Sequence, residues 1–345
     1  MIIKIGIVDS DIDYVSRLES VLSGYDDVEV YTYTDATNIE VNLKSAKLDV
    51  LLFADDMYVA AMEKQTKLAV MFLDETGAVK PELAGFETVQ KYQRISSIYK
   101  MIIEQYAAIV GVSTERAGNR TKIVTCWSPV GGVGKTTISL AMATRLAKEG
   151  KSVFYINFET YPSDGTYLED KLGRGIRELA ADIRKDINFE LKIKGLLQEK
   201  STNFYYMNHF DKVIDFKDTS EDELKELVEV IANHGGFDYI IADIDSSVNT
   251  KNKRVIDIAD KVILLGSQDS YATRKMAAFY DELVNKDLDS AKYLSVRNKM
   301  TPGASLTIEN EINFVANLPQ LNGTNEVIIN SLADNMFMGQ IVEAL

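Results

Sequence analysis

The chain has 345 residues, of which 46% are hydrophobic, and 38 Lys and Arg stand against 52 Asp and Glu, giving a net charge of −14. This length suits two ordinary domains, and the acidic balance argues against non-specific binding to DNA or anionic lipid, which depends on basic patches. A single cysteine, Cys126, excludes an internal disulfide, and the two histidines lack Cys or His neighbours at the spacing of zinc ligands.

The first third of the chain alternates strand and helix patterns. Strands are expected at 2–8, 28–33, 49–53, 67–73 and 88–92, and helices at 11–22, 38–46 and 96–110. Such alternation predicts an α/β domain with a parallel sheet that helices cover on both faces. We place this first domain at residues 1–112 and a polar linker, rich in small residues, at 113–120.

Residues 121–345 show the same alternation. Strands are expected at 123–127, 152–158, 204–207, 239–243, 261–265, 293–296 and 313–316. A capping box, with Ser220 three residues before Glu223, predicts the start of a helix. The sequence therefore predicts a second α/β domain with a parallel sheet.

Nothing in the sequence has the length and apolarity of a membrane span, and residues 1–8 lack the apolar core of a signal peptide. Residues 325–345 contain no Lys or Arg, so tethering to a membrane by a basic helix is not expected there. We therefore expect a cytoplasmic protein without direct membrane insertion.

Residues 128–137, Ser-Pro-Val-Gly-Gly-Val-Gly-Lys-Thr-Thr, form a glycine-rich turn between a strand pattern and a helix pattern. In such a turn, backbone N–H groups and the helix N-terminus face phosphate oxygens. Lys135 would reach the outer phosphates and the Thr136 hydroxyl would ligate Mg²⁺. The alternative, a chance glycine-rich turn, fits the strand–loop–helix context poorly. The residues expected to hold the nucleotide are Gly131, Gly132, Val133, Gly134, Lys135, Thr136 and Thr137.

The loop departs from the strict phosphate-loop pattern, which needs a glycine where Pro129 stands. From Gly131 to Thr137 it resembles the variant loop of the MinD/ParA-like ATPases, Lys-Gly-Gly-x-Gly-Lys-Thr-Thr. Val130 stands where that family carries an extra signature lysine. The resemblance implies ATP and Mg²⁺ as cofactors and a face-to-face homodimer formed with ATP.

Two further strands end in polar residues that suit this chemistry. Asp243 ends the apolar strand 239–243. In phosphate-loop enzymes an acid at the end of such a strand holds Mg²⁺ through water. The alternative is that Asp243 only begins a turn. Asn157 and Glu159 stand where the MinD/ParA-like family has Asp-x-Asp, whose second acid orients the attacking water. Glu159 keeps the charge on a longer side chain, which weakens such positioning, and an ordinary strand-end acid is an equal interpretation. The resemblance assigns catalytic roles to Lys135, Glu159 and Asp243.

Two later residues resemble the base-binding part of that family. Asn298 follows the strand pattern 293–296, where the family has an Asn that contacts the adenine edge. Pro319 resembles a proline-bearing loop near the base. An ordinary turn residue is the alternative for Asn298.

The first domain resembles a response-regulator receiver with altered acids. Receivers have two adjacent acids after the first strand, a phosphorylated Asp after the third, and a Lys after the last. Here a serine follows Asp9, Ala54 takes the phosphoacceptor position with Asp55 one step further, and Lys91 matches the lysine. The chain after Leu73 also looks short by one strand–helix exchange. We expect little or no phosphorylation and a role in docking or dimerisation; any small α/β domain is the alternative.

A degenerate receiver followed by a MinD/ParA-like ATPase is similar to the TadZ/CpaE family. That family implies a protein concentrated at a cell pole, which localises the assembly of Flp (tight-adherence) pili together with secretion ATPases and other pilus-assembly proteins. Because Val130 removes a cation from the dimer site, we expect ATP binding with slow or negligible hydrolysis.

Three other functions are weighed against this one. A ParA-type partition ATPase needs a basic DNA-binding surface, which the charge disfavours, so no DNA binding is expected. A MinD-type division-site regulator would end in a basic amphipathic helix. A phosphotransfer regulator with an ATPase output is disfavoured by Ala54.

Overall fold

The computed structural model divides the chain into two units. The first comprises Met1–Ser113 and Lys185–Gly195, and the second comprises Thr114–Arg184 and Leu196–Leu345. The linker predicted at 113–120 lies, apart from Arg120, outside the described residues. The described residues are 1–35, 39–60, 62–74, 79–111, 120–168, 174–210, 212–285, 290–301 and 314–345.

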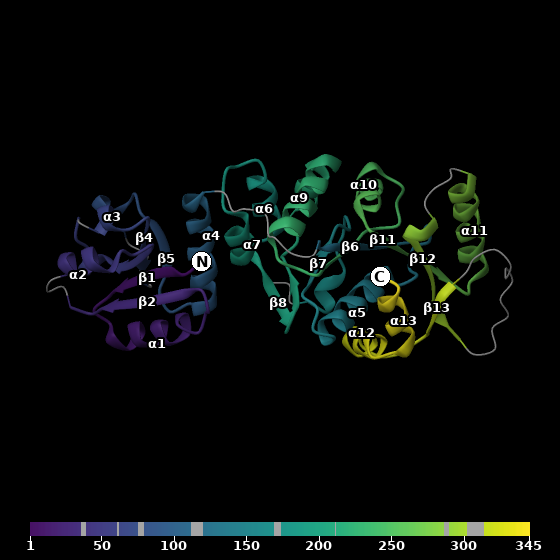
Figure 1. Cartoon of the computed structure of the whole chain (residues 1–345), viewed down its shortest axis with the longest axis horizontal. Coiled ribbons are helices and arrows are strands. Elements are labelled where there is room, and N and C mark those ends of the chain that lie inside the picture. Colours follow the sequence, from purple (N-terminus) through teal and green to yellow (C-terminus); the bar gives the residue numbers. More distant parts are fainter. Residues whose placement is uncertain are drawn as a thin grey trace. The chain divides into compact units, whose positions relative to one another are not determined.

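The first unit contains a five-stranded parallel sheet in the order β2-β1-β3-β4-β5, as in flavodoxin-like domains (Figure 1). Side chains alternate between the two faces of each strand, so Ile5 and Ile7 join one buried cluster while Val8 joins the other. The elements are β1 (Ile3–Val8), α1 (Ile12–Leu22), β2 (Val28–Tyr33), α2 (Ile39–Ala46), β3 (Val50–Ala54), η1 (Asp55–Met57), α3 (Met62–Gln65), β4 (Leu68–Leu73), η2 (Pro81–Leu83), β5 (Glu87–Gln90) and α4 (Ile95–Val110).

The receiver-like α/β fold predicted for this part is confirmed. The shortfall expected after Leu73 affects a helix and not a strand. Strand β5 is in place, and between β4 and β5 the described residues form the 3₁₀ turn η2. The sheet therefore has its five strands, and among the described residues the connection between β4 and β5 contains a 3₁₀ turn in place of a helix.

Residues 185–195 belong to the first unit, although the sequence placed them in the second domain. They include most of helix α7 (Phe189–Leu196), whose Leu191 joins a buried cluster of the first unit. The Lys192 ammonium forms a buried ion pair with Glu104 at 2.5 Å, and Lys194 pairs with Asp27 at 2.6 Å. Apolar packing and paired charges thus hold this segment, and the first unit is discontinuous in sequence.

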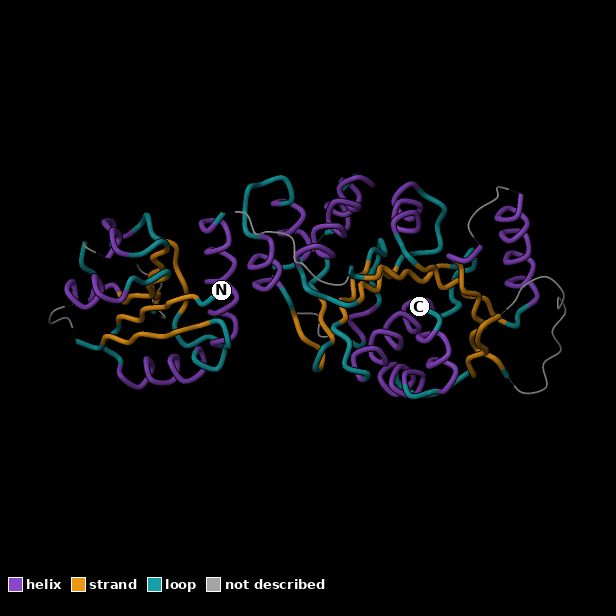
Figure 2. The backbone as a smooth tube through the Cα atoms, viewed as in Figure 1, coloured by secondary structure: helices purple, strands orange, loops and turns teal. Residues whose placement is uncertain are grey.

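The second unit contains an eight-stranded sheet in the order β13-β12-β11-β6-β10-β7-β9-β8, with helices on both faces (Figure 2). All strand pairs are parallel except the edge pair β8–β9. The elements are β6 (Lys122–Trp127), α5 (Lys135–Lys148), β7 (Val153–Asn157), η3 (Asp164–Thr166), α6 (Ile176–Asp182), β8 (Gln198–Ser201), β9 (Phe204–Tyr206), α8 (Val213–Asp218), α9 (Glu221–His234), β10 (Tyr239–Asp243), α10 (Thr250–Ile258), β11 (Lys261–Ser267), α11 (Ser270–Asn285), η4 (Ser290–Lys292), β12 (Tyr293–Met300), β13 (Phe314–Pro319), α12 (Asn325–Ala333) and α13 (Met336–Glu343).

Strand β6 occupies the point at which the strand order reverses, since β10 and β7 lie on one side of it and β11 and β12 on the other. Open α/β sheets bind ligands outside the carboxyl ends of the strands at such a point. The loop after β6 leads into α5, which packs with α12 and α13. The predicted P-loop α/β fold is confirmed, and so is the capping box, in which the Ser220 side chain accepts from the Glu223 N–H.

Among the described residues, no helix combines the length and the apolarity that crossing a membrane requires.

Candidate nucleotide-binding site

Three strands of the second unit end beside one another and bring the predicted residues to one edge of the sheet. In the strand register, Asp243 at the end of β10 is opposite Asn157 on β7 and Cys126 on β6. The glycine-rich loop follows β6, and Glu159 lies two residues beyond β7. The parallel sheet therefore gathers the loop and both acids at its carboxyl edge.

The loop conformation depends on two glycines. Gly132 has a φ of 73° and Gly134, the N-cap of α5, has a φ of 96°, both in the left-handed region that favours glycine. A Cβ on Gly134 would also lie 2.6 Å from the Asn298 amide nitrogen, so no side chain fits there. The loop thus closes tightly over the N-terminus of α5, where backbone N–H groups suit an anion.

Lys135 is 8% exposed and its ammonium donates to the Ser246 hydroxyl at 2.9 Å. Ser246 in turn donates to the carbonyl oxygen of Val130 at 3.1 Å. The serine, three residues after Asp243, therefore holds the ammonium against the loop. Sequence analysis missed this residue, because a serine after a strand is unremarkable until the fold brings it to Lys135.

Asp243 is fully buried, and the Tyr155 hydroxyl donates to its Oδ2 at 3.0 Å. Its Oδ1 is buried without a hydrogen-bond partner in the described part of the chain. The pKa of Asp243 is raised to about 7, chiefly by burial and also by the charge of Glu159, while the hydroxyls of Thr136 and Tyr155 and the charge of Lys135 oppose the rise.

This environment fits a magnesium ion. A cation or a hydrogen-bond donor would stabilise a buried carboxylate oxygen that accepts no hydrogen bond. The Thr136 hydroxyl lies beside the same carboxylate. Mg²⁺ keeps most of its water and needs only one or two protein oxygens beside the phosphates of its nucleotide. Thr136 and Asp243 would hold the ion, which would neutralise phosphate charge.

The charge of Glu159 interacts with Lys135 and Asp243. Burial raises the pKa of Glu159, the ammonium of Lys135 opposes that rise, and the charges of Asp164 and Asp245 reinforce it. The Ser163 hydroxyl donates to the Glu159 carboxylate at 3.3 Å. The backbone N–H of Glu159 donates to the side-chain oxygen of Asn157 at 2.7 Å. Asn157 thus shapes the turn after β7.

The two residues expected near the base lie beyond β11. The Asn298 amide nitrogen donates to the carbonyl oxygen of Val133 at 2.9 Å, so this side chain contacts the phosphate loop directly. Pro319 ends β13, opposite Met300 on β12. Whether either residue contacts a base stays a prediction.

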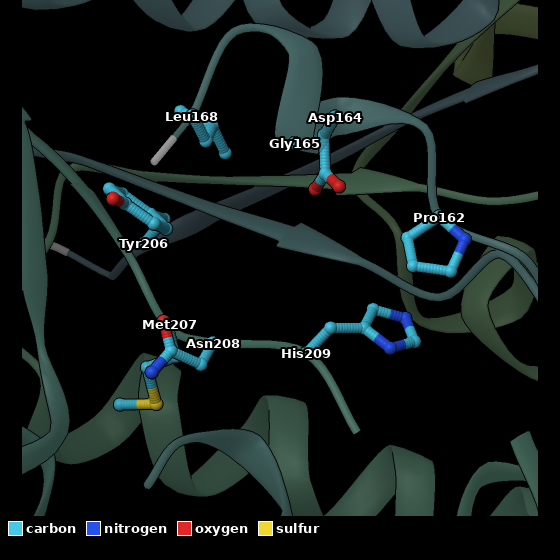
Figure 3. Close-up of a pocket in the computed structure, with 8 residues that line it drawn as sticks. All are labelled: Pro162, Asp164, Gly165, Leu168, Tyr206, Met207, Asn208 and His209. Atoms are coloured by element: carbon cyan, nitrogen blue, oxygen red, sulfur yellow. The ribbon is translucent and has the colours of Figure 1, made fainter. Parts of the chain in front are cut away.

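A small pocket adjoins the segment that follows Glu159, between that segment and the end of β9 (Figure 3). Asp164 lines it and also contributes to the raised pKa of Glu159, which links the pocket to the acid side of the site. The lining residues are Pro162, Asp164, Gly165, Leu168, Tyr206, Met207, Asn208 and His209.

In the first unit, two of the residues that correspond to a receiver's phosphorylation site, Asp9 and Lys91, form an ion pair. The Lys91 ammonium lies 2.6 Å from Oδ2 of Asp9, and these side chains are only 12% and 2% exposed. Ala54 ends β3 with a buried methyl group, and Asp55 pairs with Lys80 at 3.1 Å. The lysine is thus neutralised by a carboxylate, and a methyl group occupies the phosphoacceptor position.

Comparison with known proteins agrees with this geometry. Residues 121–293, half of the chain, match the family model of the AAA domain, and residues 1–107 match that of the TadZ-like receiver domain. The chain belongs to the AAA domain family and carries a TadZ-like receiver domain. Its second unit has the fold of the MinD/ParA-like ATPases.

Two curated relatives and one solved structure illustrate the likeness. An uncharacterized ATP-binding protein of Methanocaldococcus jannaschii is 28% identical over 152 residues, which cover 44% of this chain and 54% of that protein. The septum site-determining protein MinD of Buchnera aphidicola is 26% identical over 176 residues, which cover 51% and 63%. The chain therefore spans between about half and just under two thirds of the curated relatives' length.

A plasmid partition protein from Borrelia burgdorferi, solved bound to AMPPNP, has a TM-score of 0.51 with 18% identity, covering 65% of this chain and 98% of that one. This likeness concerns the fold.

Proposed function

We propose that the second unit binds Mg-ATP between the loop 128–137 and the acids Asp243 and Glu159. The observation that carries the proposal is the buried Oδ1 of Asp243, which accepts no hydrogen bond from the described residues and belongs to a carboxylate beside Thr136, while the neighbouring Lys135 ammonium is held by Ser246. Lys135 would exchange its bond to Ser246 for the outer phosphates, and Thr136 and Asp243 would hold the Mg²⁺ that accompanies them.

We further propose that hydrolysis is slow. Val130 packs its apolar side chain partly against the core, at the position that carries a lysine in relatives with the signature. A missing cation at the γ-phosphate lowers rates by orders of magnitude. Glu159 is the acid available to orient water, and its longer side chain places the carboxylate less favourably than an aspartate would. Binding and release of ATP would then act as the switch.

At the level of the cell, we propose a cytoplasmic, ATP-dependent homodimer that marks a pole for the assembly of Flp (tight-adherence) pili. The TadZ-like receiver match and the resemblance of the whole chain support this role. Partners would be pilus-assembly proteins, met through the first unit, whose paired Asp9 and Lys91 favour docking over phosphotransfer. A ParA- or MinD-type positioning ATPase is the alternative, and the net charge of −14 disfavours its DNA-binding form.

One sample tests these points together. Light scattering of the full chain with and without Mg-ATP should show a monomer that becomes a dimer, while phosphate release in the same sample stays slow. Brisk turnover would contradict the slow-hydrolysis proposal, and an unchanged mass would contradict the ATP-dependent dimer. A shift of non-specific duplex DNA at physiological salt would favour the partition alternative.

A further inference from the structure

Two consecutive residues at the end of β12 donate to two consecutive carbonyl groups of the glycine-rich loop. The Asn298 amide nitrogen is 2.9 Å from the Val133 oxygen, and the Lys299 ammonium is 2.7 Å from the Gly132 oxygen. In a regular strand, neighbouring side chains point to opposite faces of the sheet and do not meet one loop. A local irregularity must therefore aim both side chains the same way.

That irregularity is visible in the backbone. The register between β12 and β13 shifts between Arg297 and Met300, and Lys299 has a φ of 58°, in the left-handed region that a lysine rarely adopts. Bulges of this kind occur beside active sites, where they redirect a side chain. Two hydrogen bonds between Thr301 and Gln268 fix the chain immediately beyond the bulge. The surrounding structure thus maintains a conformation that the lysine alone would avoid.

The contacts decide which way the loop's N–H groups face. In a trans peptide the carbonyl of one residue and the N–H of the next point in opposite directions. Because the Lys299 ammonium binds the Gly132 carbonyl oxygen, the Val133 N–H points away from β12. Because the Asn298 amide binds the Val133 carbonyl oxygen, the Gly134 N–H also points away from β12. These two N–H groups lie in the part of the loop that precedes the N-terminus of α5.

We propose that Lys299, together with Asn298, is a positioning residue of the phosphate loop. It fixes the orientation of the Val133 and Gly134 N–H groups toward the phosphates of a nucleoside triphosphate. Lys299 also brings a second ammonium to the loop besides that of Lys135, in a chain whose Val130 carries no charge. The proposal rests on nucleotide binding at this loop, as proposed above.

The test variant is Lys299→Gly, because glycine accepts the left-handed φ and removes only the side chain. Lys299→Arg restores a long cationic side chain. The control is Lys148→Gly, which removes a lysine at the far end of α5, about 20 Å along the helix. Titration calorimetry of the full chain with Mg-ATP should show an affinity about tenfold lower for Lys299→Gly, from loss of a charge-assisted hydrogen bond. Lys299→Arg should recover most of the affinity, and Lys148→Gly should match the wild type.

A second readout separates positioning of the phosphate cradle from a general loss of structure. Inorganic tripolyphosphate should displace a fluorescent ATP analogue from the wild type, and its own affinity should fall by the same factor in Lys299→Gly. Wild-type affinity in Lys299→Gly, or absence of recovery in Lys299→Arg, would overturn the inference while leaving nucleotide binding intact. Failure of the wild type to bind ATP at all would overturn the proposed function instead.

Discussion

Replacing Asp243 by asparagine should make the metal-free chain more stable at alkaline pH. The folded-state pKa of Asp243 is raised from 3.8 to about 7, chiefly by burial, so the fold favours the protonated carboxyl. The stability that this group contributes is complete below pH 3.8 and is lost as pH rises through 7. The raised pKa corresponds to about 4 kcal/mol of destabilisation above pH 7, of which about 2 kcal/mol arises between pH 5.5 and 8.5. An asparagine side chain at this position would escape that penalty while still accepting from the Tyr155 hydroxyl.

The assay is urea unfolding in EDTA at pH 5.5 and 8.5, followed by the fluorescence of Trp127. This is the one tryptophan of the sequence, and it is buried at the end of β6, so it reports on the second unit. The advantage of Asp243→Asn over wild type should grow by about 2 kcal/mol from the lower to the higher pH. Asp334→Asn, at an exposed carboxylate, is the control and should show no such growth. If Asp243→Asn is no more stable than wild type, or if its advantage in unfolding free energy does not depend on pH, burial does not destabilise the ionised Asp243.

Three further outcomes are expected. Lys91→Met should destabilise the first unit by about 3 kcal/mol, because it leaves Asp9 buried without its partner, and adding Asp9→Asn should recover most of the loss in thermal unfolding followed by circular dichroism. Gly134→Ala should lower both stability, by about 1–3 kcal/mol, and the affinity for Mg-ATP in titration calorimetry, since its Cβ would meet Asn298 in a left-handed backbone; unchanged values would mean that the loop relaxes freely. Incubation with acetyl phosphate and Mg²⁺ should add no phosphoryl group by intact mass, because Ala54 offers no acceptor, and a stoichiometric adduct would contradict this.

The features that local sequence patterns encode were predictable. The apolar strands, the glycine loop and the acid at the end of β10 each lie within one short segment, and the fold confirms the two α/β domains. Strand β8, Gln-Glu-Lys-Ser, escaped prediction because its composition is polar and it lies at a sheet edge without an apolar face.

What the sequence could not supply are contacts between distant segments. Ser246 reaches Lys135, and Tyr155 reaches Asp243, only because neighbouring parallel strands bring their ends together. The direction of the Lys299 side chain depends on a register shift between β12 and β13, which no local sequence pattern predicts. The segment 185–195, which includes most of helix α7, belongs to the first unit and forms a buried ion pair there that its sequence pattern does not reveal.

The central claim is that the loop 128–137 holds the phosphates of ATP through Lys135. Its most direct test is titration calorimetry of Mg-ATP with the wild-type chain and with Lys135→Ala. Saturable binding by the wild type and an affinity at least about tenfold lower in the variant are predicted, because the ammonium is lost from the phosphates. Equal affinity in the two proteins would contradict the account.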